Sequence, residues 1–194
     1  MNGGKLEVAA TEDSTQDFYG KADEAKVATG EHSFHIYGQI AAATLDAGHV
    51  VVEDGGLIVI TKATGDVELE VADSGMAYIP AGTPSADIAS EVVTAAGYEL
   101  KDGAIQPTEA TAAKNVYKIG SKAELIQFRN DWNAGNILAI VPFVLTADID
   151  ISGTNWLPIG NWKHPFNGTF DGNGHTISGL TAVGTLGADG VYNI

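Results

Sequence analysis

Three aspartates and an asparagine form the densest group of oxygen ligands in the sequence. Asp148 and Asp150 lie on one short segment, and Asp171 and Asn173 follow on a later one. Such groups can act as the acid and base of polysaccharide cleavage or as calcium ligands. The spacing matches no calcium loop, because no D-x-D-x-D-G run with a distal glutamate occurs. The alternative is structural: Asp148 and Asp150 point outward from a strand, while Asp171 and Asn173 close turns through backbone hydrogen bonds.

Histidine side chains are candidate acid–base groups or metal ligands. His164 and His175 lie on separate turns without a partner motif, so an exposed turn or coil stacking is the simpler interpretation. His32 and His35 are three positions apart, which on a strand puts them on opposite faces. We therefore expect no metal site and no cofactor.

Aromatic side chains offer a binding surface. Trp156 and Trp162, with Tyr117, can form a platform for sugar rings, whereas core packing is the alternative for Trp156. No nucleophile elbow, Walker loop, zinc signature or dinucleotide fingerprint is present, and we predict no catalytic residues. The candidate binding residues are Trp156, Trp162, Asp171, Asn173 and His175.

Composition excludes several classes of protein. The formal net charge is −15, with 25 acidic and 10 basic residues, which disfavours nucleic acid and anionic membranes as partners. The sequence has no cysteine, which removes disulfides, thiolate metal sites and a cysteine nucleophile. No apolar run reaches about 18 residues, so we expect no membrane insertion.

The segment 145–180 determines the predicted architecture. It opens with L-T-A-D-I-D-I-S, whose apolar and polar residues alternate as in a strand with one buried face. Asn-Gly, Asp-Gly and Asn-Gly then interrupt short apolar pairs, and these dipeptides favour tight turns. Strands this short are not stable as an isolated hairpin sheet, but they can be the coils of a solenoid, each buried by the next.

One amphipathic helix is predicted over 121–132. Ser121 and Glu124 form a capping box at its start, and Leu125, Phe128 and Trp132 fall on one face. We expect this face to cover the first coil of the solenoid, which would otherwise be exposed.

The first half of the chain is predicted to be β-rich. Strands with glycine-rich turns are expected over 33–40, 48–60, 66–71 and 76–79, and an antiparallel sandwich stays open as an alternative there. Ser85 or Asp87 is expected to cap a short helix that runs to Ala96, before a hairpin that turns at Asp102 and Gly103. Residues 11–30 are expected to form a loop or a short helix.

Two strings carry a resemblance to a known family. The first is D-I-D-I-S-G-x-x-W-x-P-I-G, and the second is P-F-N-G-T-F-D-G-N-G-H-T-I-S-G-L. Over roughly 116–180 the chain resembles the right-handed parallel β-helix surface proteins of gut bacteria, which often carry GLUG-type repeats. The resemblance implies an all-β fold of parallel β-helix segments with the helix 121–132 as a cap.

Three regions follow from these patterns. Residues 1–106 are expected to form a β-helix-like segment, 107–115 a linker, and 116–194 the N-terminal part of a capped β-helix repeat domain. The proteins that this chain resembles usually continue with a Gly-Leu-Phe-Gly segment, and this sequence ends before one occurs. We therefore expect a domain truncated at its C-terminus.

The expected function is that of a non-enzymatic fragment of a secreted or cell-surface bacterial protein. It would serve as a structural stalk or an adhesin-like module, with a host or bacterial glycan or a surface protein as its partner. The expected location is extracellular or on the cell surface, although the sequence carries no export signal. The alternatives are a carbohydrate-active β-helix lyase or hydrolase, and a phage fibre or capsid-attached structural protein.

Overall fold

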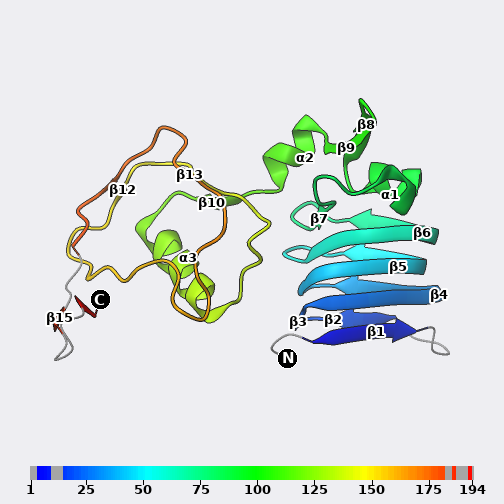
Figure 1. Ribbon diagram of the computed structural model, residues 1–194, viewed down its shortest axis with the longest axis horizontal. Helices are drawn as coiled ribbons and strands as arrows, with labels where there is room; N and C mark the ends of the chain where they lie inside the picture. Colours follow the sequence, from blue (N-terminus) through cyan, green and yellow to red (C-terminus); the bar gives the residue numbers. More distant parts are fainter. Residues whose placement is uncertain (1–3, 10–14, 182–184, 187–191, 194) are drawn as a thin grey trace. The chain divides into compact units, whose positions relative to one another are not determined.

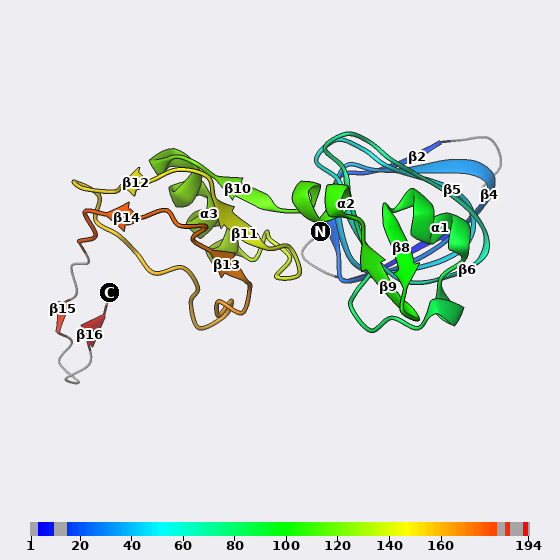
Figure 2. The ribbon, with the colours of Figure 1, turned by 90° about the horizontal axis from the view of Figure 1, so that it is seen from above.

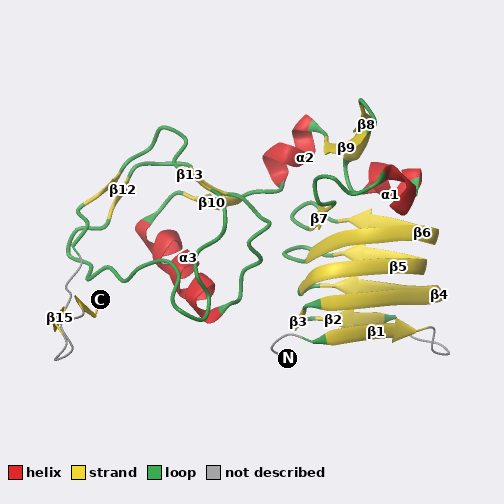
Figure 3. Cartoon of the chain, in the orientation of Figure 1, coloured by secondary structure: helices red, strands yellow, loops and turns green. Residues whose placement is uncertain are grey.

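The protein consists of two compact units, Met1–Asn115 and Val116–Ile194. The computed structural model describes residues 4–9, 15–181, 185–186 and 192–193. Strands make up most of the first unit and loops most of the second, and Figure 3 shows this contrast.

The first unit is a parallel β-solenoid. Its strands form one seven-stranded sheet with the path β1-β4-β5-β6-β7, in which β2 pairs with β4 and β3 with β5. Every pairing in this sheet is parallel, and the strands are stacked as successive layers in Figure 1. The strands are β1 (Lys5–Ala9), β2 (Gln16–Phe18), β3 (Lys21–Ala22), β4 (Glu24–Ile36), β5 (Gln39–Val52), β6 (Leu57–Val71) and β7 (Met76–Tyr78).

Each coil of this solenoid is short. Paired residues are 16 to 19 positions apart, from Phe34 opposite Val50 to Lys5 opposite Glu24. Seen from above in Figure 2, the coils superpose into one rounded outline. The parallel pairing confirms the solenoid and excludes the antiparallel sandwich for this sheet.

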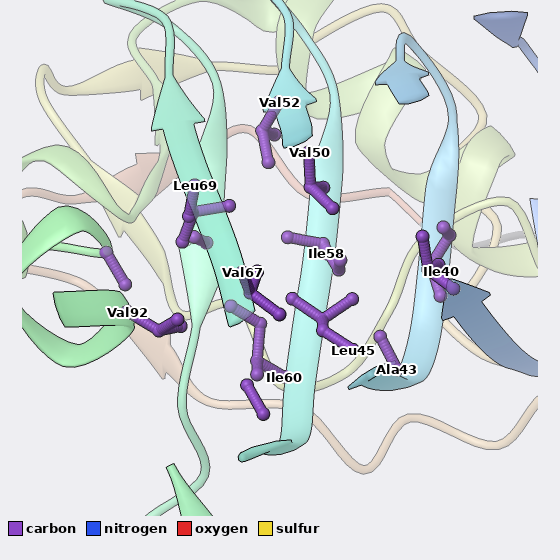
Figure 4. Close-up of a cluster of buried hydrophobic side chains, with 14 of the residues drawn as sticks. Ile40, Ala43, Leu45, Val50, Val52, Ile58, Ile60, Val67, Leu69 and Val92 are labelled. Atoms are coloured by element: carbon purple, nitrogen blue, oxygen red, sulfur yellow. The ribbon is translucent and has the colours of Figure 1, made fainter. Parts of the chain in front are cut away.

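The solenoid core is built from rows of stacked side chains. Ala22, Ile40, Ile58 and Ala77 are partners in successive coils, and all four are buried. Figure 4 shows such side chains converging between the strands, with Val92 of a helix beside them. Full burial of a residue such as Ile58 stabilises the fold by about 1.5–3 kcal/mol, so the rows hold the coils in register.

The expectation of a loop or short helix over residues 11–30 is wrong for the part that the structure describes. Residues 16–18, 21–22 and 24–30 belong to strands β2, β3 and β4. Alanines fill inward positions here, as Ala22 and Ala25 do, while charged residues such as Glu24 and Lys26 face solvent. Because alanine is only weakly hydrophobic, the alternation of inward apolar and outward polar residues is hard to recognise in this part of the sequence.

A helix and a hairpin cover the last coil of the first unit. Helix α1 (Ser90–Ala95) follows the 3₁₀ turn η1 (Ser85–Asp87), and Val92 and Val93 join the solenoid core. The expected cap is wrong, because the residue before α1 is Ala89 and its side chain makes no capping bond. The hairpin is confirmed: β8 (Tyr98–Lys101) pairs antiparallel with β9 (Ala104–Pro107) around Asp102 and Gly103, both with positive φ.

Helix α2 (Glu109–Lys114) leads to the end of the first unit. The side chain of Thr108 caps it by accepting a hydrogen bond from the Thr111 amide. Asn115, the residue after the helix, is buried and donates through Nδ2 to the carbonyl oxygen of Ala77 at 3.0 Å. This bond ties the segment to strand β7.

The second unit also contains stacked parallel strands, but its coils are longer. Tyr117 is opposite Phe143, and Phe143 is opposite Phe170, so partners are 26 and 27 positions apart. Residues Thr185–Leu186 (β15) and Tyr192–Asn193 (β16) pair antiparallel. The parallel strands are β10 (Tyr117–Ile119), β11 (Phe143–Leu145), β12 (Ile149–Asp150), β13 (Phe170–Asp171) and β14 (Ile177–Ser178).

The predicted amphipathic helix is confirmed as α3 (Lys122–Ala134). Ser121 accepts from the Glu124 amide at 3.2 Å, and the Glu124 carboxylate accepts from the Gly120 amide at 2.8 Å. Leu125, Phe128 and Trp132 are buried in one cluster with side chains of β11 and β12. The apolar face of α3 therefore packs on the core formed by the strands of the second unit.

Candidate functional site

Two of the candidate aspartates of the second unit, Asp150 and Asp171, act as acceptors for turns. Asp171 accepts a hydrogen bond from the Asn173 amide at 2.8 Å, and Asn173 donates through Nδ2 to the Leu145 carbonyl at 3.3 Å. Asp150 accepts from the amide and the hydroxyl of Ser152 at 2.8 and 3.0 Å. The Asp171 contact matches the turn-closing alternative, and Asp150, expected only to point outward, closes a turn as well.

His175 joins this network through the preceding coil. Its Nδ1 lies 3.4 Å from Oδ1 of Asp148, and the same oxygen accepts from the Thr176 amide at 2.8 Å. The hydrogen bond from the Thr176 amide is the main reason why the pKa of Asp148 is lowered, and His175 contributes less. The structure thus brings Asp148, Asp171, Asn173 and His175 together around one turn.

The two predicted tryptophans lie in different surroundings. Trp156 packs against the core of the second unit, lies under the guanidinium of Arg129 at 5.0 Å, and lines an apolar pocket of about 300 Å³. Trp162 is 87% exposed, with the Lys163 ammonium 5.2 Å from its ring centroid. Trp162 is therefore the accessible one of the two indoles.

The loop that carries these tryptophans is fastened to the end of α3. Asn133 donates to the Pro158 carbonyl at 3.0 Å and accepts from the Gly160 amide at 2.7 Å. Its own carbonyl oxygen is 2.8 Å from Nδ2 of Asn161 and 3.0 Å from Nδ1 of His164. His164 thus has a structural contact at the helix terminus.

In the first unit, two tyrosines that the sequence analysis did not select form an exposed stack. The rings of Tyr19 and Tyr37 are 4.6 Å apart between centroids and 8° from parallel. Tyr19 is 70% exposed, and its hydroxyl donates to Asp17 at 3.4 Å. The stack joins two neighbouring coils and presents aromatic carbon beside a carboxylate.

A second outward group contains histidines and glutamates. His35 is 2.6 Å from Glu53 between Nδ1 and Oε1, and His49 is 3.3 Å from Glu70 between Nε2 and Oε1. His32, which the sequence places three residues before His35, takes part in neither contact. The spacing of the histidines in the sequence does not reveal these carboxylate partners, which lie 18 and 21 residues further along the chain.

A periodic signal could have found these groups. Gly20, Gly38, Gly56 and Gly75 recur at intervals of 18, 18 and 19 residues and mark the same corner of successive coils. Counting coils from these glycines places Tyr19 against Tyr37. The same count brings the strand of His49 beside the strand of Glu68 and Glu70.

No family model, no curated protein and no solved structure matches this chain. The class of protein therefore rests on the structure: a mostly β protein with parallel strands stacked as a β-solenoid. Among the described residues, no helix is long and apolar enough to cross a membrane.

Proposed function

We propose that the chain is a structural module of a secreted or cell-surface bacterial protein, in which the solenoid serves as a stalk and displays binding side chains. The observation that carries this proposal is the stacked register of the first unit. From β1 to β7 each strand is hydrogen-bonded to a neighbour in the next coil, and the corners are bonded as well, for example Leu57 N–H to the Gly38 carbonyl at 2.9 Å.

A stalk needs a surface that stays fixed along its length. In a solenoid, each coil contacts only its neighbours, so outward side chains form rows at a constant spacing. Weak contacts made by such rows add up when a partner is itself repetitive. A glycan chain is a partner of this kind, and the resemblance to gut-bacterial GLUG-type surface proteins supports the same assignment.

The cellular location can be tested with antibodies raised against residues 1–115. We expect them to label intact cells of the source organism, and to label them equally after permeabilisation. Labelling that appears only after permeabilisation would contradict the surface location while leaving the fold untouched.

The non-enzymatic part of the proposal needs a separate assay. The protein is incubated with a panel of acidic and neutral polysaccharides, with and without calcium, and new reducing or unsaturated ends are measured. We expect no turnover. Turnover that is lost in Asp171→Asn would favour the alternative of a carbohydrate-active β-helix enzyme.

Two surfaces are candidates for glycan binding: the tyrosine stack of the first unit and the turn residues of the second. The tyrosine stack is the better supported. Asp171 and Asn173 already bond turns, whereas Tyr19 offers an exposed ring beside the Asp17 carboxylate. Aromatic faces bind the apolar faces of sugars, and a carboxylate accepts from sugar hydroxyls. On a glycan array we expect Tyr19→Ala to lose retention and Trp162→Ala to keep it. If Trp162→Ala loses retention and Tyr19→Ala keeps it, the glycan-binding surface lies on the second unit instead.

A further inference from the structure

Three potential metal ligands converge on the outer face of the solenoid. They are one imidazole nitrogen of His49 and one carboxylate oxygen each of Glu68 and Glu70. These atoms all lie within 4.8 Å of one another. His49 is half-buried and the two glutamates are exposed, so the two carboxylates are accessible from solvent.

The backbone register brings the three side chains together. His49 on β5 is the direct partner of Glu68 on β6, and Glu70 follows two residues later on the same face. The alternate residues Val50 and Leu69 point inward and are buried in the core. The ligands therefore sit on two adjacent hydrogen-bonded strands, which hold their Cα positions fixed.

A hydrogen bond orients the imidazole. Nδ1 of His49 is 2.9 Å from the hydroxyl oxygen of Ser33, its partner on the preceding coil. When Nδ1 carries the proton and donates it to Ser33, the lone pair of Nε2 points toward the glutamates. Such a bond on the second nitrogen is the usual way in which a ligating histidine is held in one tautomer.

Nε2 of His49 is the atom that needs an explanation. This atom is buried and has no hydrogen-bond partner among the residues that the structure describes, although Oε1 of Glu70 is only 3.3 Å away. With the proton on Nδ1, the Nε2 lone pair faces the Glu70 carboxylate, and that contact is repulsive. A cation between the two atoms would turn it into an attraction. The neighbouring pair differs, because His35 makes a direct 2.6 Å contact with Glu53.

We propose that His49, Glu68 and Glu70 bind a divalent transition-metal ion, with Zn²⁺ as the first candidate. One neutral imidazole and two carboxylates balance the charge of such an ion, and nitrogen–oxygen sets of this kind suit zinc at about 2.0–2.2 Å. Three protein ligands leave a fourth position for water. Because the ligands come from β5 and β6, the ion would join two adjacent coils.

The test is a calorimetric titration of the whole chain with Zn²⁺ at neutral pH. We expect one site, and a loss of affinity of about tenfold or more in His49→Gln and in the double variant Glu68→Gln/Glu70→Gln. Bound zinc should also raise the melting temperature of the wild-type protein but not of these variants. The matched control is His35→Gln, which removes an imidazole from the adjacent coil and should leave zinc affinity unchanged.

Ser33→Ala tests the orienting bond. We expect it to keep the one-site stoichiometry and weaken zinc binding by about tenfold, the usual effect of losing such a partner. Circular dichroism of each metal-free variant shows whether it is folded. The proposal is overturned if the wild-type chain binds no zinc, if His49→Gln binds it as tightly as wild type, or if His35→Gln loses as much affinity as His49→Gln.

Discussion

Gly38 lies so close above Gly20 that a Cβ atom on Gly38 would overlap the carbonyl oxygen of Gly20. That oxygen already accepts the Gln39 amide at 2.9 Å, so the lower coil cannot move away without losing a bond of the stack. The same corner recurs one coil later, where a Cβ on Gly56 would overlap the carbonyl oxygen of Ile36. Glycine at this corner therefore sets the distance between coils.

Gly38→Ala should lower the free energy of unfolding by at least about 3 kcal/mol, the upper end of the usual cost of overpacking. The measurement is a denaturant melt followed by far-ultraviolet circular dichroism. Gly103→Ala is the control, because Gly103 has a φ of 81° but open space around it, and the left-handed conformation alone costs about 1–2 kcal/mol. Equal losses in both variants would refute the role of the corner.

Phe128→Ala should cost on the order of 3 kcal/mol, since the ring is buried and its centroid lies 4.4 Å from that of Phe143. All three tryptophans of the chain lie in the second unit, so their fluorescence follows its unfolding. The exposed neighbour Gln127→Ala should stay within about 0.5 kcal/mol of wild type. A loss below about 1 kcal/mol for Phe128→Ala would mean that the helix is not docked.

Asn133→Ala should destabilise the second unit by about 2 kcal/mol, because it removes two hydrogen bonds of about 1 kcal/mol each. These bonds fasten the loop at Pro158 and Gly160 to the helix end. Asn136→Ala, at an exposed position of the same segment, is the matched control. If both variants melt like wild type, the loop is held by its apolar contacts alone.

Acid should weaken the second unit partly through Asp150. Hydrogen bonds from the amide of Ser152, and then from its hydroxyl, lower the pKa of Asp150 below its ordinary value of 3.8. A carboxylate with a lowered folded pKa contributes stability above its unfolded pKa and loses it as the pH falls through the folded pKa.

The unfolding free energies of wild type and Asp150→Asn should therefore differ above the unfolded pKa of the carboxyl group and converge as the pH falls through its lowered folded pKa. Fluorescence melts across this range measure the difference. A difference that does not change with pH would show that the carboxylate charge is not what stabilises the turn.

The sequence alone determined several of the local elements of this protein. The capping box at Ser121, the apolar face of Leu125, Phe128 and Trp132, and the hairpin at Asp102 all occur where their patterns predict. Each of these signals lies within a few neighbouring residues, where backbone preference and side-chain period act directly. Alternation with glycine-rich turns favoured stacked parallel strands but left an antiparallel sandwich open in the first half, which the parallel pairing then excluded.

The glycine period gives the length of a coil, but the tertiary structure decided which residues meet across coils, because the register shifts within the paired strands. Partners such as His49 and Glu68, or Tyr19 and Tyr37, are 18 or 19 residues apart, and their contact depends on the register of the coils between them. Shifting a strand by one residue would turn each side chain to the opposite face. That register is fixed by core rows such as Ile40 on Ile58 and by corners such as Gly38 on Gly20, which exist only once the coils are stacked.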